Sequence, residues 1–501
     1  MFQVTEISQL PPNPPADLPR TLGELRAAGH RYRTVKQELR ENLLARMRSG
    51  EDRFPGIVGY QDTVLPEVER ALLAGHDLVL LGERGQGKTR LIRGLVQLLD
   101  EWTPVLPGSA LNEHPMHPLT PAARRLAAEA GDDLPVAWLH RSLRYGEKLA
   151  TPDTSVGDLI GDVDPIRIAE GRTLGDPETI HFGLVPRTNR GIFAVNELPD
   201  LAERIQVSLL NVLEERDIQV RGYQLRLPLD LLLVASANPE DYTNRGRIIT
   251  PLKDRFGAEV RTHYPLELEL ELELIRQEAA LVAAVPEHVL EVLARFARAV
   301  RESPSVDPRS GVSARFAIAA AETVAAAALR RGSLLGEETE GTGAPVARVG
   351  DAVSVTSTLR GKVEFESGEE GREVEILGHL LRTATAETFR DRLAGLDLSG
   401  FINLVAEGAV IETGELVGTA DLLRQVGTVP GLAKALDRLG LGDAPTPGEA
   451  AAGIEFVLEG LHLTRRLAKD VTEDGRTRYG GRSPEGGRSA GGGRPSDGGR
   501  G

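Results

Sequence analysis

A short glycine-rich segment constrains the possible fold of this chain more than any other feature. The segment reads Gly82-Glu83-Arg84-Gly85-Gln86-Gly87-Lys88-Thr89 and matches the pattern G-x-x-x-x-G-K-[ST]. An apolar run at residues 78–81 precedes it, and Leu and Ile recur at helical spacing over residues 91–99. Glycines let such a loop turn its backbone N–H groups inward around an anion, and the positive end of the following helix adds to the attraction. The sequence therefore predicts a strand, a phosphate-binding loop and a helix in that order.

The pattern indicates a nucleoside triphosphate as the ligand, with ATP and Mg²⁺ as the expected cofactors. Lys88 would reach the β- and γ-phosphates, and the hydroxyl of Thr89 would hold the Mg²⁺ ion. A glycine-rich turn that binds nothing is the alternative, and the strand and helix on either side of the loop argue against it. The residues expected to contact the nucleotide here are Gly82, Glu83, Arg84, Gly85, Gln86, Gly87, Lys88, Thr89 and Arg90.

Composition narrows the class of protein further. The net charge of −15, from 59 Lys and Arg against 74 Asp and Glu, disfavours general binding to nucleic acids or anionic membranes. The chain has no Cys, so it forms no disulfide and no thiolate metal site, which fits a reducing compartment. No apolar stretch approaches the ~20 residues that a membrane helix needs, and the N-terminus does not resemble a signal peptide. We expect a cytoplasmic protein with no stable membrane insertion and no specific nucleic-acid partner.

The segment 51–265 has the pattern of an α/β domain. Short apolar strands alternate with helices, which is typical of a parallel sheet with helices on both faces. Residues 104–132 contain several prolines and little periodicity, so an irregular insert is expected there. The expected strands are residues 78–81, 136–140, 192–195, 231–235 and 260–263.

The rest of the chain divides by composition. Leu and Glu alternate at residues 266–274, but both are strong helix formers, so we expect a helix rather than a strand. The Gly/Arg/Ser-rich terminus is expected to be disordered, and a solubilising role is favoured over binding to a polyanion because aromatic residues are nearly absent. The predicted parts are a partly helical N-terminal extension (1–50), a nucleotide-binding core with hairpin insertions (51–265), a helical lid (266–332), a mostly helical region (333–472) and the tail (473–501).

A second apolar strand brings an acid to the expected site. Residues 192–195 are followed by Asn196 and Glu197, and Glu197 would polarise an attacking water as a general base. An Asp is usual before such a Glu. Asn196 offers an oxygen without a charge, so it would hold Mg²⁺ less tightly, through a bound water. The alternative is a core strand that ends in a surface Glu.

Further polar residues follow later in the chain. Asn238 follows the strand at 231–235 and would hold the attacking water or touch the γ-phosphate. A turn formed by Asn238 and the proline after it is the simpler alternative. Arg255 is the candidate arginine finger, a cation that can raise rates by ~10³–10⁵, and it would act on the neighbouring subunit's site. Arg245 and Arg247 are its rivals, and a surface ion pair with Asp254 is the alternative. Arg315 could clamp the phosphates from the lid, with Arg309 as a second candidate.

Taken in order, these motifs resemble an AAA+ ATPase. More narrowly, they are similar to the ATPase (I) subunit of magnesium chelatase and to the MoxR-like ATPases. The resemblance covers about residues 54–330 and depends on the phosphate loop together with these stretches: Ile57-Val58-Gly59-Tyr60-Gln61-Asp62, Arg190-Gly191-Ile192-Phe193-Ala194-Val195-Asn196-Glu197, Leu209-Leu210-Asn211-Val212-Leu213-Glu214, Ser236-Ala237-Asn238-Pro239 and Asp254-Arg255-Phe256-Gly257.

The resemblance implies a P-loop AAA+ core with a five-stranded parallel sheet, followed by an α-helical lid. It also implies a ring, usually hexameric, and a partner subunit that carries an integrin-like metal-binding domain. Val58 and Tyr60 would line the adenine pocket. Residues 162–190, with short strands at 166–168 and 180–182, and residues 217–227 would form hairpin insertions.

The sequence leaves several functions open. The first is an ATP-driven subunit that remodels a partner, either in a metal chelatase or in a more general maturation complex. The second is a nucleotide-gated scaffold with little hydrolysis, which the Asn at position 196 favours. A transcriptional activator is disfavoured because no helix-turn-helix or G-A-F-T-G-like loop is found. A zinc site at His114 and His117 is disfavoured because Pro115 and Pro118 prevent a regular helix and no third ligand is evident.

Overall fold

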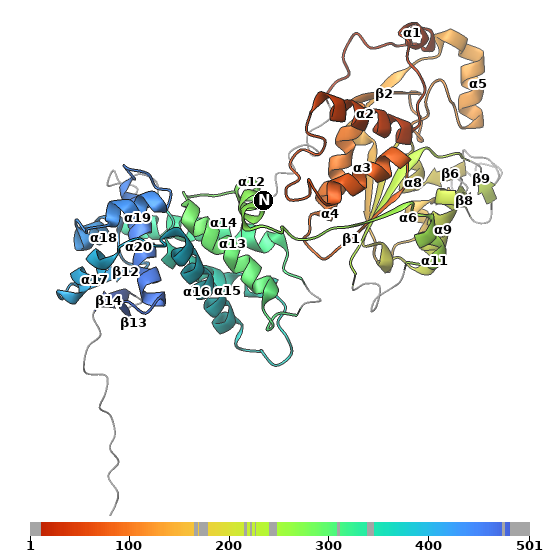
Figure 1. Cartoon of the computed structure of the whole chain (residues 1–501). Coiled ribbons are helices and arrows are strands. Elements are labelled where there is room, and N and C mark those ends of the chain that lie inside the picture. The colour runs from red at the N-terminus through yellow and green to blue at the C-terminus, as the bar shows by residue number, and fades with distance from the viewer. Residues whose placement is uncertain are drawn as a thin grey trace, which may run out of the picture. The chain divides into compact units, whose positions relative to one another are not determined.

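The computed structural model describes residues 12–164, 169, 179–214, 218–220, 223–225, 227–239, 248–307, 311–337, 345–472 and 476–480. The chain forms two compact units (Figure 1). The first consists of Met1–Gln277 with Arg309–Ala314, and the second of Glu278–Pro308 with Arg315–Gly501. Within the described residues, no helix is long and apolar enough to cross a membrane.

The first unit is an α/β domain. Its helices are α1 (Leu22–Ala27), α2 (Val35–Ser49), α3 (Val64–Ala74), α4 (Lys88–Gly94), α5 (Pro121–Ala130), α6 (Val156–Leu159), α8 (Leu184–Arg187), α9 (Glu203–Glu214), α11 (Thr250–Arg255) and α12 (Leu268–Glu278). Its strands are β1 (Leu78–Leu81), β2 (Trp102–Val105), β3 (Ala137–His140), β4 (Tyr145–Leu149), β5 (Gly161–Val163), β6 (Ile180–Phe182), β7 (Gly191–Asn196), β8 (Ile218–Val220), β9 (Tyr223–Leu225), β10 (Leu231–Ala237) and β11 (Ala258–Arg261).

Five parallel strands form the central sheet, in the order β11-β1-β10-β7-β4. Side chains alternate between its faces, as the strand period of two requires. Leu78 and Leu80 of β1 pack into one core with residues of α2, α3 and α4, whereas Val79 and Leu81 pack into a second core with α6, α8, α9 and α11. Figure 1 shows these two helix groups on opposite faces of the sheet. The predicted fold class is therefore confirmed.

One strand of the prediction belongs to a different sheet. Residues 136–140 do form a strand, β3, but it pairs with β2 in a two-stranded antiparallel sheet. The fifth place in the central sheet belongs to β4, which sequence analysis missed. The pattern Tyr145-Gly-Glu-Lys-Leu carries two charges, because an edge strand buries less of its surface than a central one.

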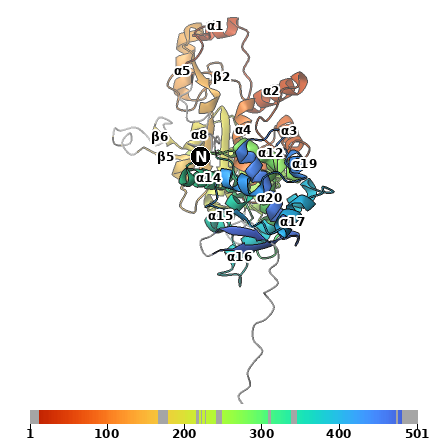
Figure 2. The same ribbon diagram turned by 90° about the vertical axis from the view of Figure 1, so that its left-hand side faces the viewer.

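The segment 104–132 is more ordered than expected. It contains the end of β2 and the helix α5, which Thr120 caps by accepting a hydrogen bond from the N–H of Ala123 (3.1 Å). None of the residues of α5 is fully buried, although Ala123, Ala127 and Ala130 pack against a small core. Figures 1 and 2 both show α5 beside α1, and a small core of Leu22, Leu25, Leu106, Leu134 and Val136 lies in this lobe.

Both predicted hairpin insertions contain antiparallel strands. The piece at 180–182 is β6, and it pairs with β5; the piece at 166–168 lies outside the described residues. In the segment 217–227, β8 pairs with β9. The predicted helix over the Leu/Glu alternation is also confirmed, as α12.

The second unit is mostly helical, with a small antiparallel sheet of order β12-β14-β13. Strand β14 lies inside the segment 473–501 that was predicted to be a disordered tail, and Tyr479 in it is buried (1% exposed). That boundary was therefore wrong for residues 477–480, and residues 481–501 lie outside the described part of the chain. The elements are α13 (Glu287–Glu302), α14 (Ala314–Leu335), α15 (Val353–Thr358), α16 (Glu373–Arg392), α17 (Ser399–Ala406), β12 (Ile411–Thr413), α18 (Thr419–Val426), α19 (Leu432–Arg438), α20 (Pro447–Leu463), β13 (Ala468–Val471) and β14 (Thr477–Gly480).

A buried ion pair attaches α2 to the central sheet. Arg144, just before β4, donates from both Nη atoms to the two oxygens of Glu38 (2.7 Å each), and the side chains are 0% and 2% exposed. Burial alone would raise the pKa of Glu38, but the hydrogen bonds from Arg144 hold this pKa below its usual value. The carboxylate is therefore charged in the folded protein and depends on its partner.

Replacing Arg144 should destabilise the first unit strongly. In Arg144→Met the Glu38 carboxylate would be buried without its cation, and we expect a loss of about 3–5 kcal/mol in the free energy of unfolding, measured by denaturant titration at pH 7. The double variant Arg144→Met/Glu38→Gln is the control, because it removes the unpaired charge and should recover part of the loss. Equal losses in the single and double variants would contradict this account.

Candidate functional site

The phosphate loop joins the carboxyl end of β1 to the start of α4. Gly85 and Gly87 both have φ +75°, a left-handed conformation that favours glycine. A Cβ at Gly85 would collide with the side chain of Ser313, and a Cβ at Gly82 would collide with the hydroxyl of Thr262. The loop is therefore packed against its neighbours so closely that only glycine fits at these two positions.

Lys88 is held at the centre of this loop. Its ammonium donates to the carbonyl of Gly82, to the carbonyl of Glu83 (2.8 Å) and to Oδ1 of Asn238 (2.9 Å). Asn238 follows β10 and is buried (6% exposed). The structure thus brings together two residues that the sequence assigned to one site from positions far apart in the chain.

Tyr60 contacts the phosphate loop from its buried side. It is 5% exposed, and its hydroxyl contacts the carbonyl of Gln86 and the carbonyl of His263 (2.9 Å to the latter). Burial raises the pKa of Tyr60 to about 12, so the hydroxyl remains protonated and can donate. The side chain of Gln86 accepts from the Glu83 N–H (3.0 Å) and from the hydroxyl of Thr262 (2.8 Å). Tyr60 therefore supports the loop through its backbone, and its expected contact with adenine stays a prediction.

The strand β7 ends in a chain of hydrogen bonds. The hydroxyl of Ser236 on β10 donates to Oδ1 of Asn196 (3.1 Å) and accepts from the backbone N–H of Glu197 (3.3 Å). The Nδ2 of Asn196 donates to Oε1 of Glu147 on β4 (2.6 Å). Glu197 adopts φ +55° and ψ +48°, which turns the chain sharply where the strand ends. Both polar atoms of the Asn196 side chain are thus engaged by protein groups.

The remaining predicted residues of the loop region lie as follows. Thr89 and Val58 are half-buried, Arg84 and Arg90 are exposed, and the guanidinium of Arg90 lies against Gly56, where a Cβ would be 2.7 Å from Nη2.

Arg255 ends α11 and pairs with Glu214 of α9 (2.6 Å), not with Asp254 as the alternative interpretation supposed. Its side chain is 45% exposed, so it is accessible at the surface of the first unit. Arg315 belongs to the second unit, and its role as a phosphate clamp stays a prediction. Arg245, Arg247 and Arg309 lie outside the described residues.

A cavity of about 380 Å³ adjoins the loop. Residues of the loop, of the segment after β10, of α11 and of β11 form its walls: Leu81, Gly82, Glu83, Gln86, Pro239, Lys253, Glu259, Arg261 and Thr262. All the strands that contribute to it do so near their carboxyl ends, where ligands bind in open α/β sheets.

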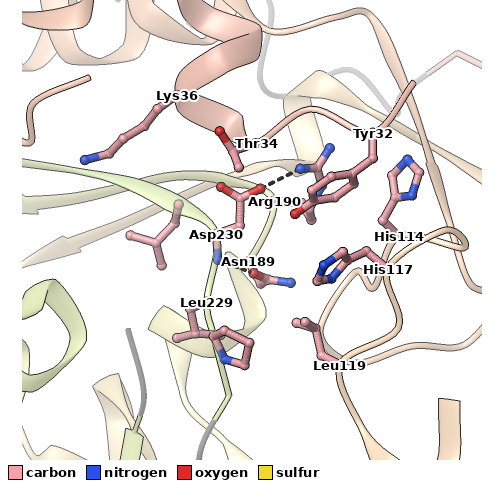
Figure 3. A pocket seen from close by; sticks show the side chains of 12 residues that line it. Tyr32, Thr34, Lys36, His114, His117, Leu119, Asn189, Arg190, Leu229 and Asp230 are labelled. Carbon is pink, nitrogen blue, oxygen red and sulfur yellow. Dashed lines mark hydrogen bonds and ion pairs between the residues drawn. The ribbon is translucent and has the colours of Figure 1, made fainter. Parts of the chain in front are cut away.

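A second cavity, of about 410 Å³, lies at the amino ends of β7 and β10 (Figure 3). There Arg190, which has φ +67°, pairs with Asp230 (2.5 Å), and its guanidinium lies 5.1 Å from the centre of the Tyr32 ring. Because the strands are parallel, this cavity is at the edge of the sheet opposite the phosphate loop. It is a feature separate from the candidate nucleotide site.

The histidines weighed as zinc ligands border this second cavity. His114 is 2% exposed, and its Nε2 lies 3.1 Å from Nε2 of His30, which sequence analysis had not linked to it. Burial, with a smaller effect of Arg190, lowers the pKa of His114 to about 2, so the ring is neutral. Within the described residues, no group of three or more His, Asp or Glu is placed to hold a metal ion.

Sequence analysis missed four side chains that shape the site. Glu147 accepts a hydrogen bond from Asn196, and Arg93 donates to Glu147. Ser236 supports the end of β7, and Thr262 supports the loop. Arg93 follows Thr89 by one helical turn, so its position on the same face of the helix as Thr89 could have been predicted. Glu147 gave none, because it is distant in the chain and on a strand that was not recognised.

Comparison of the sequence with known proteins finds several similarities. A family model described as the sigma-54 interaction domain matches residues 173–255. The magnesium-chelatase subunit ChlI of Nostoc sp. (strain PCC 7120) is 28% identical over 232 residues, which is 45% of this chain and 58% of that protein. The ChlI subunit of Guillardia theta is 27% identical over 240 residues, 46% of this chain and 64% of that protein.

A solved magnesium chelatase BchI–BchD complex also matches, at 19% identity over 82% of this chain and 95% of that chain. Its TM-score is 0.34. The sheet, the phosphate loop and the sequence matches together support the predicted class, an AAA+ ATPase. Within that class the chain resembles the ATPase subunit of magnesium chelatase, although it spans only 58% of the length of the Nostoc relative.

The contacts of Tyr60 predict a measurable effect on the loop. Tyr60→Phe would leave the carbonyls of Gln86 and His263 without their buried donor, at a cost of about 1–3 kcal/mol in the free energy of unfolding. We expect weaker binding of a fluorescent ATP analogue and a lower melting temperature.

Tyr264→Phe is the matched control, because the hydroxyl of Tyr264 donates to the Arg84 carbonyl (2.7 Å) at an exposed position. It should lose less in both measurements. If the two variants bind the analogue equally well, Tyr60 does not support the loop.

Proposed function

We propose that this chain binds ATP with Mg²⁺ and hydrolyses it. The observation that carries the proposal is the contact of Lys88 with Asn238 beneath a loop in which Gly82 and Gly85 leave no room for a side chain. That arrangement presents an ammonium, a helix start and an amide to one small region, which suits a bound triphosphate.

The oxygen donors at the loop fit a magnesium ion. Thr89 supplies a half-buried hydroxyl in the first turn of α4, and Asn196 supplies an amide oxygen at the end of β7. Hydroxyl, amide and carboxylate oxygens are the ligands that Mg²⁺ takes in proteins. When bound, Mg²⁺ would neutralise charge on the phosphates.

In this proposal the chain's own residues divide the work. Lys88 would exchange its contacts with the loop carbonyls for phosphate oxygens, because both are acceptors within its reach. Glu197 would take a proton from the attacking water, and Asn238 would orient that water. The exposed Arg255 would approach the γ-phosphate held by a neighbouring copy, which requires release from Glu214.

The downstream role that we propose is remodelling of a partner protein by an ATP-driven ring, in a complex like magnesium chelatase or in a MoxR-like complex. The sequence likeness to ChlI subunits supports this. A hexamer, and a partner with an integrin-like metal-binding domain, are part of the same proposal. Reconstitution with a candidate partner and a porphyrin would separate the two versions, because only a chelatase inserts a metal.

A second candidate is a nucleotide-gated scaffold that binds ATP and scarcely hydrolyses it. On the sequence alone, the uncharged Asn196 in place of an acid favours it. The two candidates differ in turnover and agree on binding, so a single variant distinguishes them.

Glu197→Gln should bind ATP as the unchanged chain does and lose nearly all phosphate release, by about 10²-fold or more, since the amide cannot accept the proton. Steady-state phosphate release and nucleotide affinity are the two measurements. Lys88→Ala is the control for the site, because it should lose nucleotide binding itself. If the Glu197→Gln rate equals that of the unchanged chain, Glu197 is not the base; if the unchanged chain binds ATP without turnover, the scaffold is correct.

A site shared between subunits makes a different prediction. Arg255→Ala should retain ATP binding and lose most turnover, because its own loop is intact while it gives nothing to its neighbour. Mixing it with Lys88→Ala protein should restore part of the activity, since each supplies the half that the other lacks. Absence of recovery, once exchange of subunits is verified with labelled protein, would argue that the site is complete within one chain.

A further inference from the structure

The carboxylate of Glu147 is held by a complete set of donors. Arg93 donates to it from Nε (2.9 Å) and Nη2 (3.1 Å), Tyr145 from its hydroxyl (2.9 Å), and Asn196 from Nδ2 (2.6 Å). Burial and the nearby carboxylate raise the pKa of Tyr145, so its hydroxyl stays protonated. The hydrogen bonds to Glu147 also raise the pKa of Arg93. The Glu147 carboxylate is thus fixed in place on β4, the strand next to β7.

This arrangement explains why residue 196 is an amide. Asn196 must donate to Glu147 on one side and accept from the Ser236 hydroxyl on the other. An amide does both, whereas an ionised Asp can only accept. An Asp at this position would set two carboxylates 2.6 Å apart, where they could not both be ionised. A carboxylate therefore stands on the neighbouring strand, where it is paired with Arg93 and accepts from Asn196.

The orientation of the Asn196 amide follows from the same contacts. With Nδ2 directed to Glu147, its Oδ1 is directed to the end of β10, beside Ser236. A carbonyl oxygen has two lone pairs, and Ser236 uses one of them. Hydrogen bonding of the N–H to a carboxylate also polarises an amide and makes its oxygen a stronger acceptor.

We propose that Glu147 is a positioning residue that acts through Asn196: it directs the amide oxygen toward the metal position and polarises it, while Arg93 balances the charge of Glu147 itself. The inference rests on the proposed function, since it concerns how that site holds Mg²⁺. Glu147 is not itself a ligand here, because Arg93, Tyr145 and Asn196 use its oxygens. It resembles the carboxylates behind metal-bound histidines, which orient the ligand and increase its basicity.

The first test measures metal affinity rather than turnover. A fluorescent ATP analogue is titrated with Mg²⁺, and binding of Mn²⁺ in the presence of ATP is followed separately by the loss of the free-ion electron paramagnetic resonance signal. Glu147→Gln keeps the size of the side chain and removes its charge. We expect its metal midpoint to rise by about tenfold, as for other residues behind a metal ligand, with unchanged analogue affinity in EDTA.

Glu69→Gln is the matched control, because Glu69 is also a largely buried carboxylate paired with an arginine, Arg53, but lies on α3. It should leave the midpoint unchanged. A midpoint for Glu147→Gln equal to that of Glu69→Gln would overturn the inference while the proposed function stands. If the unchanged chain binds no analogue at all, the proposed function fails and the inference fails with it.

The second test exchanges the two groups. Asn196→Asp alone should lower the melting temperature and weaken metal binding, because of the facing carboxylates. Asn196→Asp/Glu147→Gln moves the charge to β7 and the amide to β4, and should restore both measurements at least to the level of Glu147→Gln. A purely structural role predicts that the double variant recovers the melting temperature without recovering the metal midpoint, because side chains in contact are coupled in stability in either case. A double variant no better than Asn196→Asp would contradict the coupling between these side chains.

Discussion

The contact between the Lys88 ammonium and Asn238 is the interaction on which the candidate site depends. It joins the start of α4 to the end of β10 and holds the phosphate loop between them. The same ammonium also contacts two carbonyls of the loop. A lysine satisfied by carbonyl and amide oxygens can exchange them for phosphate oxygens without a large change in its surroundings. Tyr60 keeps the rest of the loop in place, because it holds the Gln86 carbonyl from the buried side.

The parallel sheet explains why distant residues meet there. Parallel strands all end at one edge, so the residues after β1, β7 and β10 are neighbours although they are separated in sequence. This rule makes Lys88, Glu197 and Asn238 predictable as a group from their positions after apolar strands. The apolar strands β1 and β10 are equally predictable, because both faces of the sheet are covered and nearly every side chain in these strands is buried.

The parts that could not be predicted lack such a signal. Strand β4 is at the edge of the sheet and carries Glu147 and Lys148, so its sequence does not have the pattern of a buried strand. The more apolar β3 has that pattern, and it was therefore assigned to the wrong sheet. The hydrogen bond between Glu147 and Asn196 depends on the pairing of β4 with β7, and nothing in the local sequence of either residue indicates it.

That hydrogen bond changes how Asn196 should be interpreted. Taken from the sequence, an amide before Glu197 suggests a site that holds metal weakly and therefore turns over slowly. In the structure the amide is one member of a chain that runs from Arg93 through Glu147 to Asn196, Ser236 and the backbone of Glu197. The carboxylate on the neighbouring strand is paired with Arg93 and orients the amide, and the same chain fixes the backbone of the proposed base. A weaker ligand and a better oriented base have opposite effects on turnover, so the residue type at position 196 does not by itself favour the scaffold over the motor.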